Sequence, residues 1–340
     1  RAGVQLLKVE IGGDAFATQG AEPAHRRSAA EPPTLRGWEW WLMREARLRN
    51  PALRFHGLPW AWPGYLGPWQ RLFKEHAEQA ADYIVSWVKL AQEQGFRIDS
   101  VGLWNEKRYE RRYIEALRLA LDGAGFRETL VAAADSDFGR IVDEVLRDHG
   151  LRSLVGALSG HYPGQRSGRA HMTDIPHIWA GEDYSTDNRK SGAGCIARVL
   201  NQNFVSGSMT ATFLWNLVSS FYRGLPYPHT GLLDADEPWS GHYTVSPAVY
   251  AVAHTTRFAQ PGWHYLASGH GSGLLHHGGS FVSLVSPEAS EPALTIVVEK
   301  MSHGHSKCVR PPLPHFAAAE EVLSLHLSGF PHVRELHVWR

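Results

Sequence analysis

The chain has 340 residues, of which 43% are apolar and 20% charged, and its 34 Lys and Arg balance its 34 Asp and Glu. This composition excludes a disordered chain, and zero net charge argues against a general nucleic-acid-binding protein, which needs excess basic residues. No apolar run reaches the length of about 18 residues that a membrane span requires. The 20 histidines would make the chain strongly cationic near a pH of about 5, which suits an acidic compartment.

Short apolar runs alternate with longer helical patterns, which is typical of βα units on a parallel sheet. The expected strands are 6–12, 53–60, 100–106, 130–135, 154–162, 177–183 and 211–217. Helical periodicity is clearest at 35–50, 70–94, 109–124 and 138–149. These patterns predict an α/β fold, a TIM (β/α)8 barrel, whose first strand we expect to precede Arg1.

The pattern changes after residue 262. Short alternating runs follow at 280–285, 293–299, 322–327 and 334–339, separated by Gly, Pro, Ser and His, and no helical pattern of useful length occurs. Such alternation is typical of antiparallel strands. We therefore predict two domains, a catalytic TIM barrel over 1–262 and an incomplete antiparallel β-sandwich unit over 263–340.

Two glutamates lie at predicted carboxyl ends of barrel strands. Glu106 ends the motif Trp104-Asn105-Glu106, and Glu182 ends the run 177–181. Strand ends of this kind form the active-site face of a TIM barrel. A retaining glycosidase needs one carboxyl group as acid and base and a second as nucleophile, and Asn105 would suit a sugar 2-hydroxyl. The alternative is that both glutamates are solvated loop carboxylates.

Aromatic side chains at the same strand ends favour a sugar ligand. Trp60, Trp215 and the pair His161-Tyr162 close three of the predicted strands. Flat apolar faces of sugars pack on such rings, while nearby polar groups fix their orientation. Most of the 13 tryptophans are nevertheless expected to pack in the core.

Two other motifs could indicate different chemistry. His303-Gly304-His305 with Cys308 contains residue types that bind zinc, but no carboxylate or third histidine adjoins them in sequence. Gly12-Gly13-Asp14 lacks the spacing of phosphate-binding loops, so a tight turn is expected there. We predict no metal and no other cofactor.

Ordered segments along nearly the whole chain resemble the galactocerebrosidase family. They include KVEIGGD (8–14), GWEWWLM (37–43), GLPWAWPG (57–64), GLWNE (102–106), EDYST (182–186), LNQNF (200–204) and MSHGHSKCVRP (301–311). The resemblance implies an enzyme of sphingolipid catabolism, a retaining exo-β-galactosidase that hydrolyses galactosylceramide and galactosylsphingosine. It also implies that Glu106 is the proton donor and acceptor and that Glu182 is the nucleophile.

The resemblance has further implications for ligands, partners and covalent bonds. It implies substrate contacts from Thr18, Trp60, Asn105, His161, Ser185, Trp215 and Arg310, and a disulfide between Cys195 and Cys308. It also implies a saposin-type lipid-transfer partner and a lysosomal location reached through the secretory pathway. Relative to the family pattern, we expect the first barrel strand and a C-terminal lectin-like domain to be missing. The alternatives are a glycan-binding chain without activity, a glycosidase for another sugar, and a metal-dependent hydrolase.

Overall fold

The computed structural model describes residues 2–14, 22–68, 70–163, 177–183, 189–221, 224, 229–287, 292–308, 315–330, 333 and 335–339. The chain forms two compact units. The N-terminal unit comprises Gln5–His161 and Thr173–Gly181, and the C-terminal unit comprises Arg1–Val4, Tyr162–Met172 and Glu182–Arg340. The predicted domain boundary at residue 262 stays a prediction. Among the described residues, none of the helices has the length and apolar character of a membrane span.

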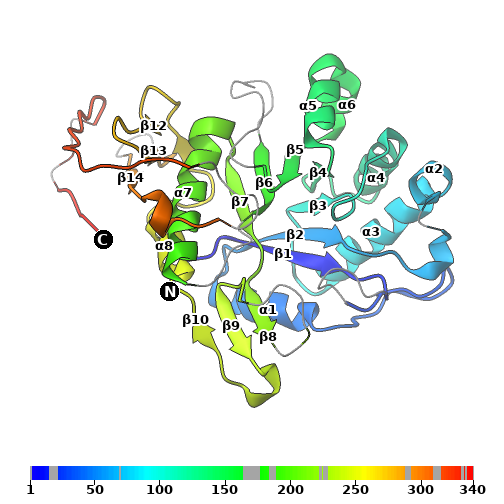
Figure 1. The fold of residues 1–340 in the computed structure, drawn as a ribbon. Helices are drawn as coiled ribbons and strands as arrows, with labels where there is room; N and C mark the ends of the chain where they lie inside the picture. Colours follow the sequence, from blue (N-terminus) through cyan, green and yellow to red (C-terminus); the bar gives the residue numbers. More distant parts are fainter. Residues whose placement is uncertain are drawn as a thin grey trace. The chain divides into compact units, whose positions relative to one another are not determined.

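Seven strands form a sheet in which the strand order follows the chain (Figure 1). Its strands are β1 (Leu6–Ile11), β2 (Arg54–Pro59), β3 (Ser100–Gly102), β4 (Leu130–Asp135), β5 (Ala157–His161), β6 (Ile178–Asp183) and β7 (Ala211–Leu214). The pairs from β1 to β5 are parallel, with Leu6 opposite Arg54 and Ala132 opposite Ala157. Every predicted barrel strand is present, and the α/β barrel class is confirmed.

Helices of the N-terminal unit cover the outer side of its strands (Figure 1). They are α1 (Glu39–Arg49), α2 (Leu72–Glu75), α3 (Ala77–Glu93), α4 (Arg111–Gly123), α5 (Phe138–Arg147) and α6 (His149–Leu154), with a 3-10 turn at Gly64–Leu66. In α3, Ile84, Trp87 and Val88 recur at helical spacing and are buried. This stripe packs toward α4, which buries Ile114 and Leu117. Each such side chain contributes about 1.5–3 kcal/mol by leaving water.

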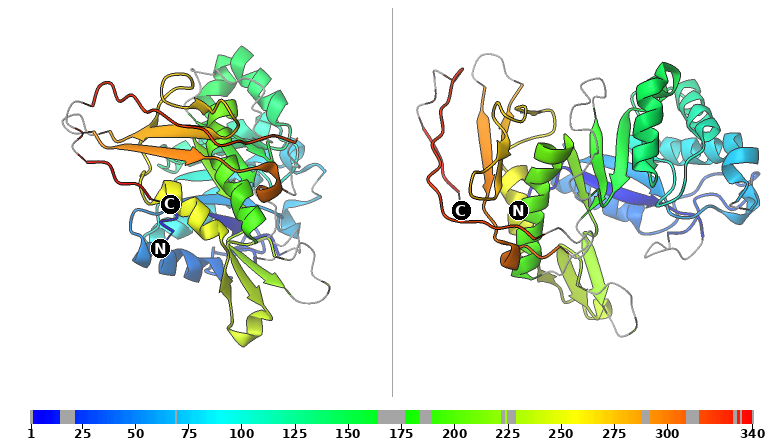
Figure 2. Two further views of the ribbon diagram at one scale, coloured as in Figure 1. Left: turned by 60° about the vertical axis from the view of Figure 1, so that its left-hand side comes forward. Right: turned by 45° about the horizontal axis from the view of Figure 1, so that its top comes forward.

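Besides β7, the described residues of the C-terminal unit form two α-helices and two small sheets (Figure 2). The helices are α7 (Lys190–Gly207) and α8 (Ala248–Thr256), with 3-10 turns at Pro238–Ser240 and His303–His305. One sheet has the order β10 (Thr244–Val245), β9 (Leu233–Asp236) and β8 (Val218–Phe221). In the other, β13 (Ser280–Val285) pairs antiparallel with β11 (His264–Tyr265), β12 (Gly273–Leu274) and β14 (Leu294–Glu299).

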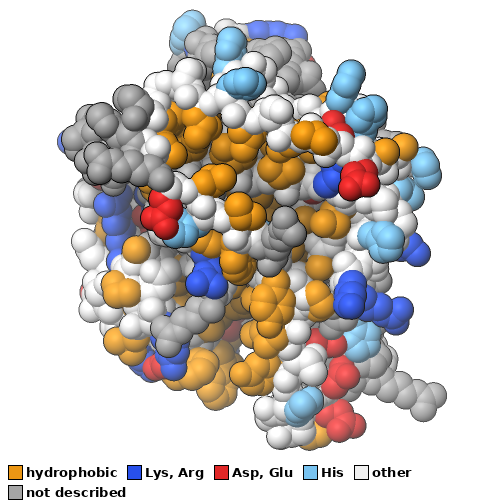
Figure 3. Space-filling model, turned by 90° about the vertical axis from the view of Figure 1, so that its left-hand side faces the viewer, with side chains coloured by type: hydrophobic (Ala, Val, Ile, Leu, Met, Phe, Trp, Pro, Cys, Tyr) orange, Lys and Arg blue, Asp and Glu red, His pale blue; other side chains and the backbone are white. Residues whose placement is uncertain are grey.

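The predicted strands at 322–327 and 334–339 are wrong for the residues that the structure describes there. The segment 315–330 has no strand, and neither do residues 333 and 335–339. Val322 is 94% exposed, so the alternating apolar side chains do not cover a sheet face. Figure 3 shows hydrophobic side chains and histidines gathered on this side of the molecule. The ring of Trp339 instead packs 4.3 Å from His254 and 5.2 Å from Phe258, measured between ring centroids.

A disulfide joins α7 to the chain that follows the second small sheet. Cys195 on α7 is bonded to Cys308, with the two Cα atoms 5.2 Å apart, which confirms the predicted pair. The neighbouring Gly194 allows this close approach, because a Cβ atom there would lie only 2.0 Å from the carbonyl oxygen of His305. Cys308 therefore has no thiolate to offer a metal, and the zinc interpretation of the motif at 303–308 is excluded.

Three glutamates of the N-terminal unit are linked by hydrogen bonds between β1 and α1. A carboxylate oxygen of Glu39 accepts from the backbone N–H of Glu10, and Glu10 accepts from that of Glu22 at 3.2 Å. Glu22 in turn accepts from the N–H of Glu39 at 3.1 Å. They line a small cavity together with His25 and Arg36. Desolvation, reinforced by the charges of Glu22 and Glu10, raises the pKa of Glu39 well above its ordinary value.

The raised pKa of Glu39 predicts a pH-dependent stability. The contribution of protonated Glu39 is complete below its unfolded pKa of about 4.5 and is lost as the pH rises through the folded value. Glu39→Gln should therefore raise the melting temperature at a pH of about 7.5, by about 2–4 °C for each kcal/mol gained, and change it little at a pH of about 4.5. Circular dichroism at both pH values measures this. Glu45→Gln on the same helix is the control, and an equal shift at both pH values would contradict the interpretation.

The disulfide predicts a second stability effect. Cys195 and Cys308 are separated by 113 residues, and the chain-entropy model assigns a loop of this length about 4–5 kcal/mol. The double variant Cys195→Ser, Cys308→Ser should lower the free energy of unfolding by about 2–5 kcal/mol in denaturant titrations. Ser191→Ala, also on α7, serves as a control. A double variant as stable as the parent would show that the bridge does not constrain the unfolded chain.

Candidate active site

The segment Trp104-Asn105-Glu106 follows directly after β3 and is held against the end of β2. The indole N–H of Trp104 donates to the carbonyl of Trp60 at 3.0 Å, and the backbone N–H of Asn105 donates to that of Pro59 at 2.9 Å. Asn105 is only 8% exposed. Glu106 has a φ of 51°, a conformation that non-glycine residues rarely adopt. Such strain persists where surrounding contacts enforce it and is frequent at functional sites.

Glu106 lies beside a buried pair formed by Asp135 and His161. One oxygen of Asp135 accepts from the backbone N–H of Glu106 at 3.3 Å. The other lies 3.1 Å from Nε2 of His161, whose Nδ1 is 3.5 Å from the Glu106 carboxylate. Asp135 ends β4 and His161 ends β5, so neighbouring parallel strands bring the three residues together at one edge of the sheet.

The electrostatics of this cluster favour a protonated His161. Burial by itself lowers the pKa of His161, but the charge of Asp135 and hydrogen bonds to Asp135 and Glu106 outweigh it and raise the pKa to about 9. Burial acts to raise the pKa of Asp135, yet the attraction of His161 and of Lys8 brings it below its ordinary value. The nearby His56 is different, since desolvation and the charge of Lys8 lower its pKa to about 3.

Glu182, in the C-terminal unit, is held by the residue that follows His161. The phenol of Tyr162 donates to a carboxylate oxygen of Glu182 at 2.8 Å, and the backbone N–H of Tyr162 donates to the Glu182 carbonyl at 2.7 Å. Glu182 is 5% exposed. The phenol thus fixes the direction of the carboxylate at the end of β6.

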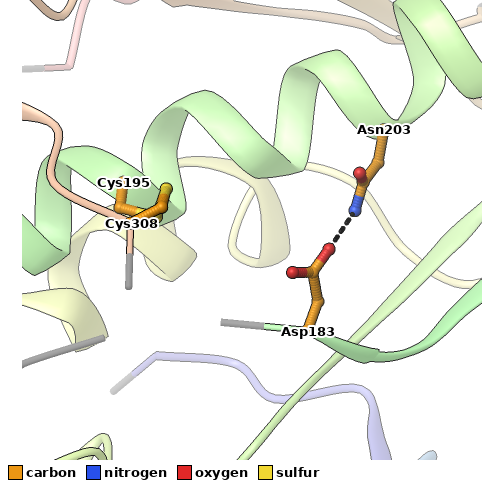
Figure 4. The surroundings of a disulfide bond; sticks show 4 residues. All are labelled: Asp183, Cys195, Asn203 and Cys308. Atoms are coloured by element: carbon orange, nitrogen blue, oxygen red, sulfur yellow. Dashed lines mark hydrogen bonds between the residues drawn. A yellow bond between two sulfur atoms is a disulfide. The ribbon is translucent and has the colours of Figure 1, made fainter. Parts of the chain in front are cut away.

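The next residue, Asp183, is fixed from α7. The side-chain amide N–H groups of Asn203 donate to the carboxylate of Asp183 and to the hydroxyl oxygen of Thr212 on β7, each at 3.0 Å. The backbone N–H of Trp215 donates to the Asp183 carbonyl at 2.9 Å. Figure 4 shows the Asp183–Asn203 bond and, on the same helix, the disulfide of Cys195. Contacts at two positions on α7, Cys195 and Asn203, therefore fix this helix against the neighbouring chain.

The predicted site residues divide between the two units. Glu106, Asn105, His161 and Trp60 lie in the N-terminal unit, where the ring centroid of Trp60 is 5.1 Å from the Lys8 ammonium. Glu182 and Trp215 lie in the C-terminal unit. The predicted substrate contacts Thr18, Ser185 and Arg310 lie outside the described residues. The roles given to all these residues stay predictions.

Sequence reasoning missed two polar residues, each of which contacts one of the two glutamates within its own unit. Asp135 is the last residue of the predicted strand 130–135, so the sequence predicts its position at a strand end. No sequence motif around it indicates a functional role. From sequence, Tyr162 is predicted only as an aromatic residue at a strand end, whereas in the structure its phenol donates to Glu182. A further group, His229, Asp234 and Asp236, has one potential metal-ligand atom each within 4.8 Å, but His229 and Asp234 are already hydrogen-bonded to each other at 2.6 Å.

Comparisons with known proteins identify related families. The model described as "Glycosyl hydrolase family 59" matches residues 1–257, and its central-domain model matches residues 265–340. The chain is 45% identical to a galactocerebrosidase of Danio rerio, covering 99% of this chain and 50% of that protein. It is 43% identical to the galactocerebrosidase of Homo sapiens, covering 99% and 49%. The chain thus spans about half the length of the curated relatives it matches.

Two solved structures have a similar fold. SrfJ from Salmonella typhimurium aligns with a TM-score of 0.64 at 15% identity, over 86% of this chain and 78% of that one. The endo-β1,6-glucanase BT3312 aligns with a TM-score of 0.60 at 14% identity, over 87% and 81%. At these identities the likeness shows the fold alone. The family matches confirm the resemblance that the sequence motifs indicated.

The contact between Asn203 and Asp183 predicts a stability effect. Asn203→Ala removes a donor from a carboxylate that is 2% exposed, so the free energy of unfolding should fall by about 1–3 kcal/mol. Urea titration measures the change. Gln202→Ala, at the adjacent half-buried position of α7, should cost clearly less. Equal effects of the two substitutions would mean that the bond to Asp183 contributes little.

Proposed function

This chain belongs to glycosyl hydrolase family 59, and on that premise we propose that it is a retaining exo-β-galactosidase of galactosylceramide and related galactolipids such as galactosylsphingosine. The products would be galactose and ceramide or sphingosine. The names of the relatives support this substrate class, since those at 41–45% identity are galactocerebrosidases. The same proposal places this hydrolysis in sphingolipid catabolism in the lysosome.

The observation that carries the proposal is the different environment of the two glutamates. Glu106 follows β3 and lies beside the His161–Asp135 pair, a partner suited to a group that gives and takes a proton. Glu182 is the penultimate residue of β6, and its carboxylate is oriented by the Tyr162 phenol, as a nucleophile requires. Each residue therefore has the partner that its assigned role needs.

The proposed reaction has two displacements. A carboxylate oxygen of Glu182 attacks the anomeric carbon, the bond from that carbon to the glycosidic oxygen breaks, and this oxygen takes the proton of Glu106 as the lipid alcohol leaves. Glu106, now a carboxylate, then removes a proton from water, whose oxygen attacks the anomeric carbon and displaces Glu182. Glu106 ends protonated, Glu182 ends ionised, and the sugar retains its configuration.

The remaining residues of the proposal act on substrate binding. Trp60 and Trp215 would pack on the sugar, and Asn105 would bind its 2-hydroxyl. Asn105 is suited to this role because its buried side-chain oxygen has no hydrogen-bond partner among the described residues. Thr18, Ser185 and Arg310 would contribute further polar contacts, and His161 would contact the substrate while it stays within ion-pair distance of Asp135 and Glu106. A saposin-type lipid-transfer protein would present the lipid.

Hydrolysis of aryl β-galactosides by the full chain tests the proposal. At a pH of about 4.5, Glu182→Gln should abolish turnover of every substrate. Glu106→Gln should lower kcat/KM for a poor leaving group by about 10²–10⁴-fold and much less for dinitrophenol, because that leaving group needs no acid. Glu115→Gln, on the exposed side of α4, is the control.

Azide provides a second readout for the acid/base. It attacks without a general base, so it should restore kcat of Glu106→Gln on the dinitrophenyl substrate and yield β-galactosyl azide. The matched β-glucoside should react far more slowly. A parent chain that hydrolyses neither glycoside would contradict the proposed function, and equal hydrolysis of the glucoside would contradict the sugar assignment.

A further inference from the structure

Both carboxylate oxygens of Asp135 act on Glu106, one by direct contact and the other by way of the His161 ring. Its Oδ2 accepts from the backbone N–H of Glu106 at 3.3 Å. Its Oδ1 lies 3.1 Å from Nε2 of His161, and Nδ1 of that ring lies 3.5 Å from Oε1 of Glu106. The backbone of Glu106 is therefore hydrogen-bonded to Asp135, and its carboxyl group lies within ion-pair distance of His161, which in turn lies within ion-pair distance of Asp135. All three residues belong to the N-terminal unit.

We infer that Asp135 is a positioning residue for the acid/base Glu106, which it fixes through the Glu106 backbone and through the ring of His161. This inference rests on the proposed function and deepens it. Asp135 does not itself react; it determines where the Glu106 carboxyl group lies and which protons its neighbour carries.

Burial and backbone strain explain why Glu106 needs such support. Asp135 is 6% exposed, and the side chain of His161 is 5% exposed, so water cannot replace their mutual contacts. Glu106 and Asp135 both have positive φ angles, 51° and 62°. Residues remain in this region only where neighbouring contacts over-determine them, and the bond between the Glu106 N–H and Asp135 is such a contact.

The number of N–H donors on the imidazole ring explains the role of His161. A neutral ring has one N–H and can donate to one carboxylate, whereas the imidazolium can donate to Asp135 and Glu106 at once. A pKa of about 9 for His161 agrees with the second form. When Glu106 loses its proton to the leaving group, the resulting carboxylate then faces a cation already in place.

Lys8, another charged group of the N-terminal unit, opposes this arrangement. Lys8 on β1 lowers the pKa of His161 by repulsion, and its ammonium donates to the carbonyl of Gly181 at 3.0 Å. His56 on β2 is neutral over the working pH range and is bonded to Ser100 at 2.8 Å. Asp135, with a smaller contribution from Glu106, thus offsets the effect of Lys8 on the pKa of His161.

The test compares Asp135→Asn with a matched control in the full chain. Asp99→Asn is the control because Asp99 also accepts a backbone N–H, that of Phe55 at 2.9 Å, but just before β3, at the amino end of the same sheet. Asp135→Asn should lower kcat/KM for a poor leaving group by about 10–100-fold and for dinitrophenyl β-galactoside by less than about threefold. Asp99→Asn should not change this ratio.

A second variant and a spectroscopic readout complete the test. His161→Gln should reproduce the leaving-group dependence, and it serves if Asp135→Asn does not fold. NMR of ¹⁵N-histidine protein should show His161 still protonated at a pH of about 8, and Asp135→Asn should lower that pKa. Equal losses on both substrates would reduce Asp135 to a structural residue and overturn the inference, as would a His161 that titrates near its ordinary pKa of about 6.5.

The measurements distinguish failure of this positioning role from failure of the proposed function. If Glu106→Gln shows the leaving-group dependence and Asp135→Asn does not, only the positioning role fails. If the parent chain has no β-galactosidase activity, the proposed function fails and this inference fails with it.

Discussion

Carboxylates at the ends of the parallel strands need partners, because an unpaired buried charge costs more free energy than a folded chain can supply. In the N-terminal unit this requirement is met between strands, where Asp135 on β4 pairs with His161 on β5. In the C-terminal unit it is met from a helix, since Asn203 of α7 donates to Asp183. In each case the aspartate that is fixed lies next to a glutamate that the family resemblance implies is catalytic.

Connectivity along the chain links the two arrangements. His161 and Tyr162 are consecutive residues, and the first contacts Glu106 while the second bonds to Glu182. A substitution that displaces this dipeptide should therefore disturb both glutamates. The disulfide of Cys195 acts at a longer range, because it constrains the same helix that carries Asn203.

Much of the fold could be predicted from sequence because parallel strands buried on both faces appear as short apolar runs. The run 130–135 gave the limits of β4, and the Trp-Asn-Glu motif placed Glu106 just after β3. The strand predicted at 322–327 is wrong, because alternating apolar residues indicate a possible sheet face but do not show whether a partner strand is available. The helix α7 is not among the segments of clearest helical periodicity, since its glycines, including Gly192 and Gly194, weaken the local helical signal.

The partners of the candidate site were harder to predict than its glutamates. A strand-end glutamate within a motif is visible in sequence, whereas the pairing of Asp135 with His161 depends on the register of β4 and β5. The same holds for the Glu10–Glu22–Glu39 group, where three backbone donors meet three carboxylates only after β1 and α1 have packed. Tertiary contacts, not local propensity, set the electrostatics of these positions.

The most direct test of the central claim is covalent labelling of the nucleophile. A 2-deoxy-2-fluoro-β-galactosyl fluoride slows both displacements, but its activated leaving group lets the first proceed, so a glycosyl-enzyme accumulates. Peptide mass spectrometry should then locate the sugar on Glu182, with no label in Glu182→Gln. A label on any other residue, or turnover with inversion at the anomeric carbon, would contradict the account.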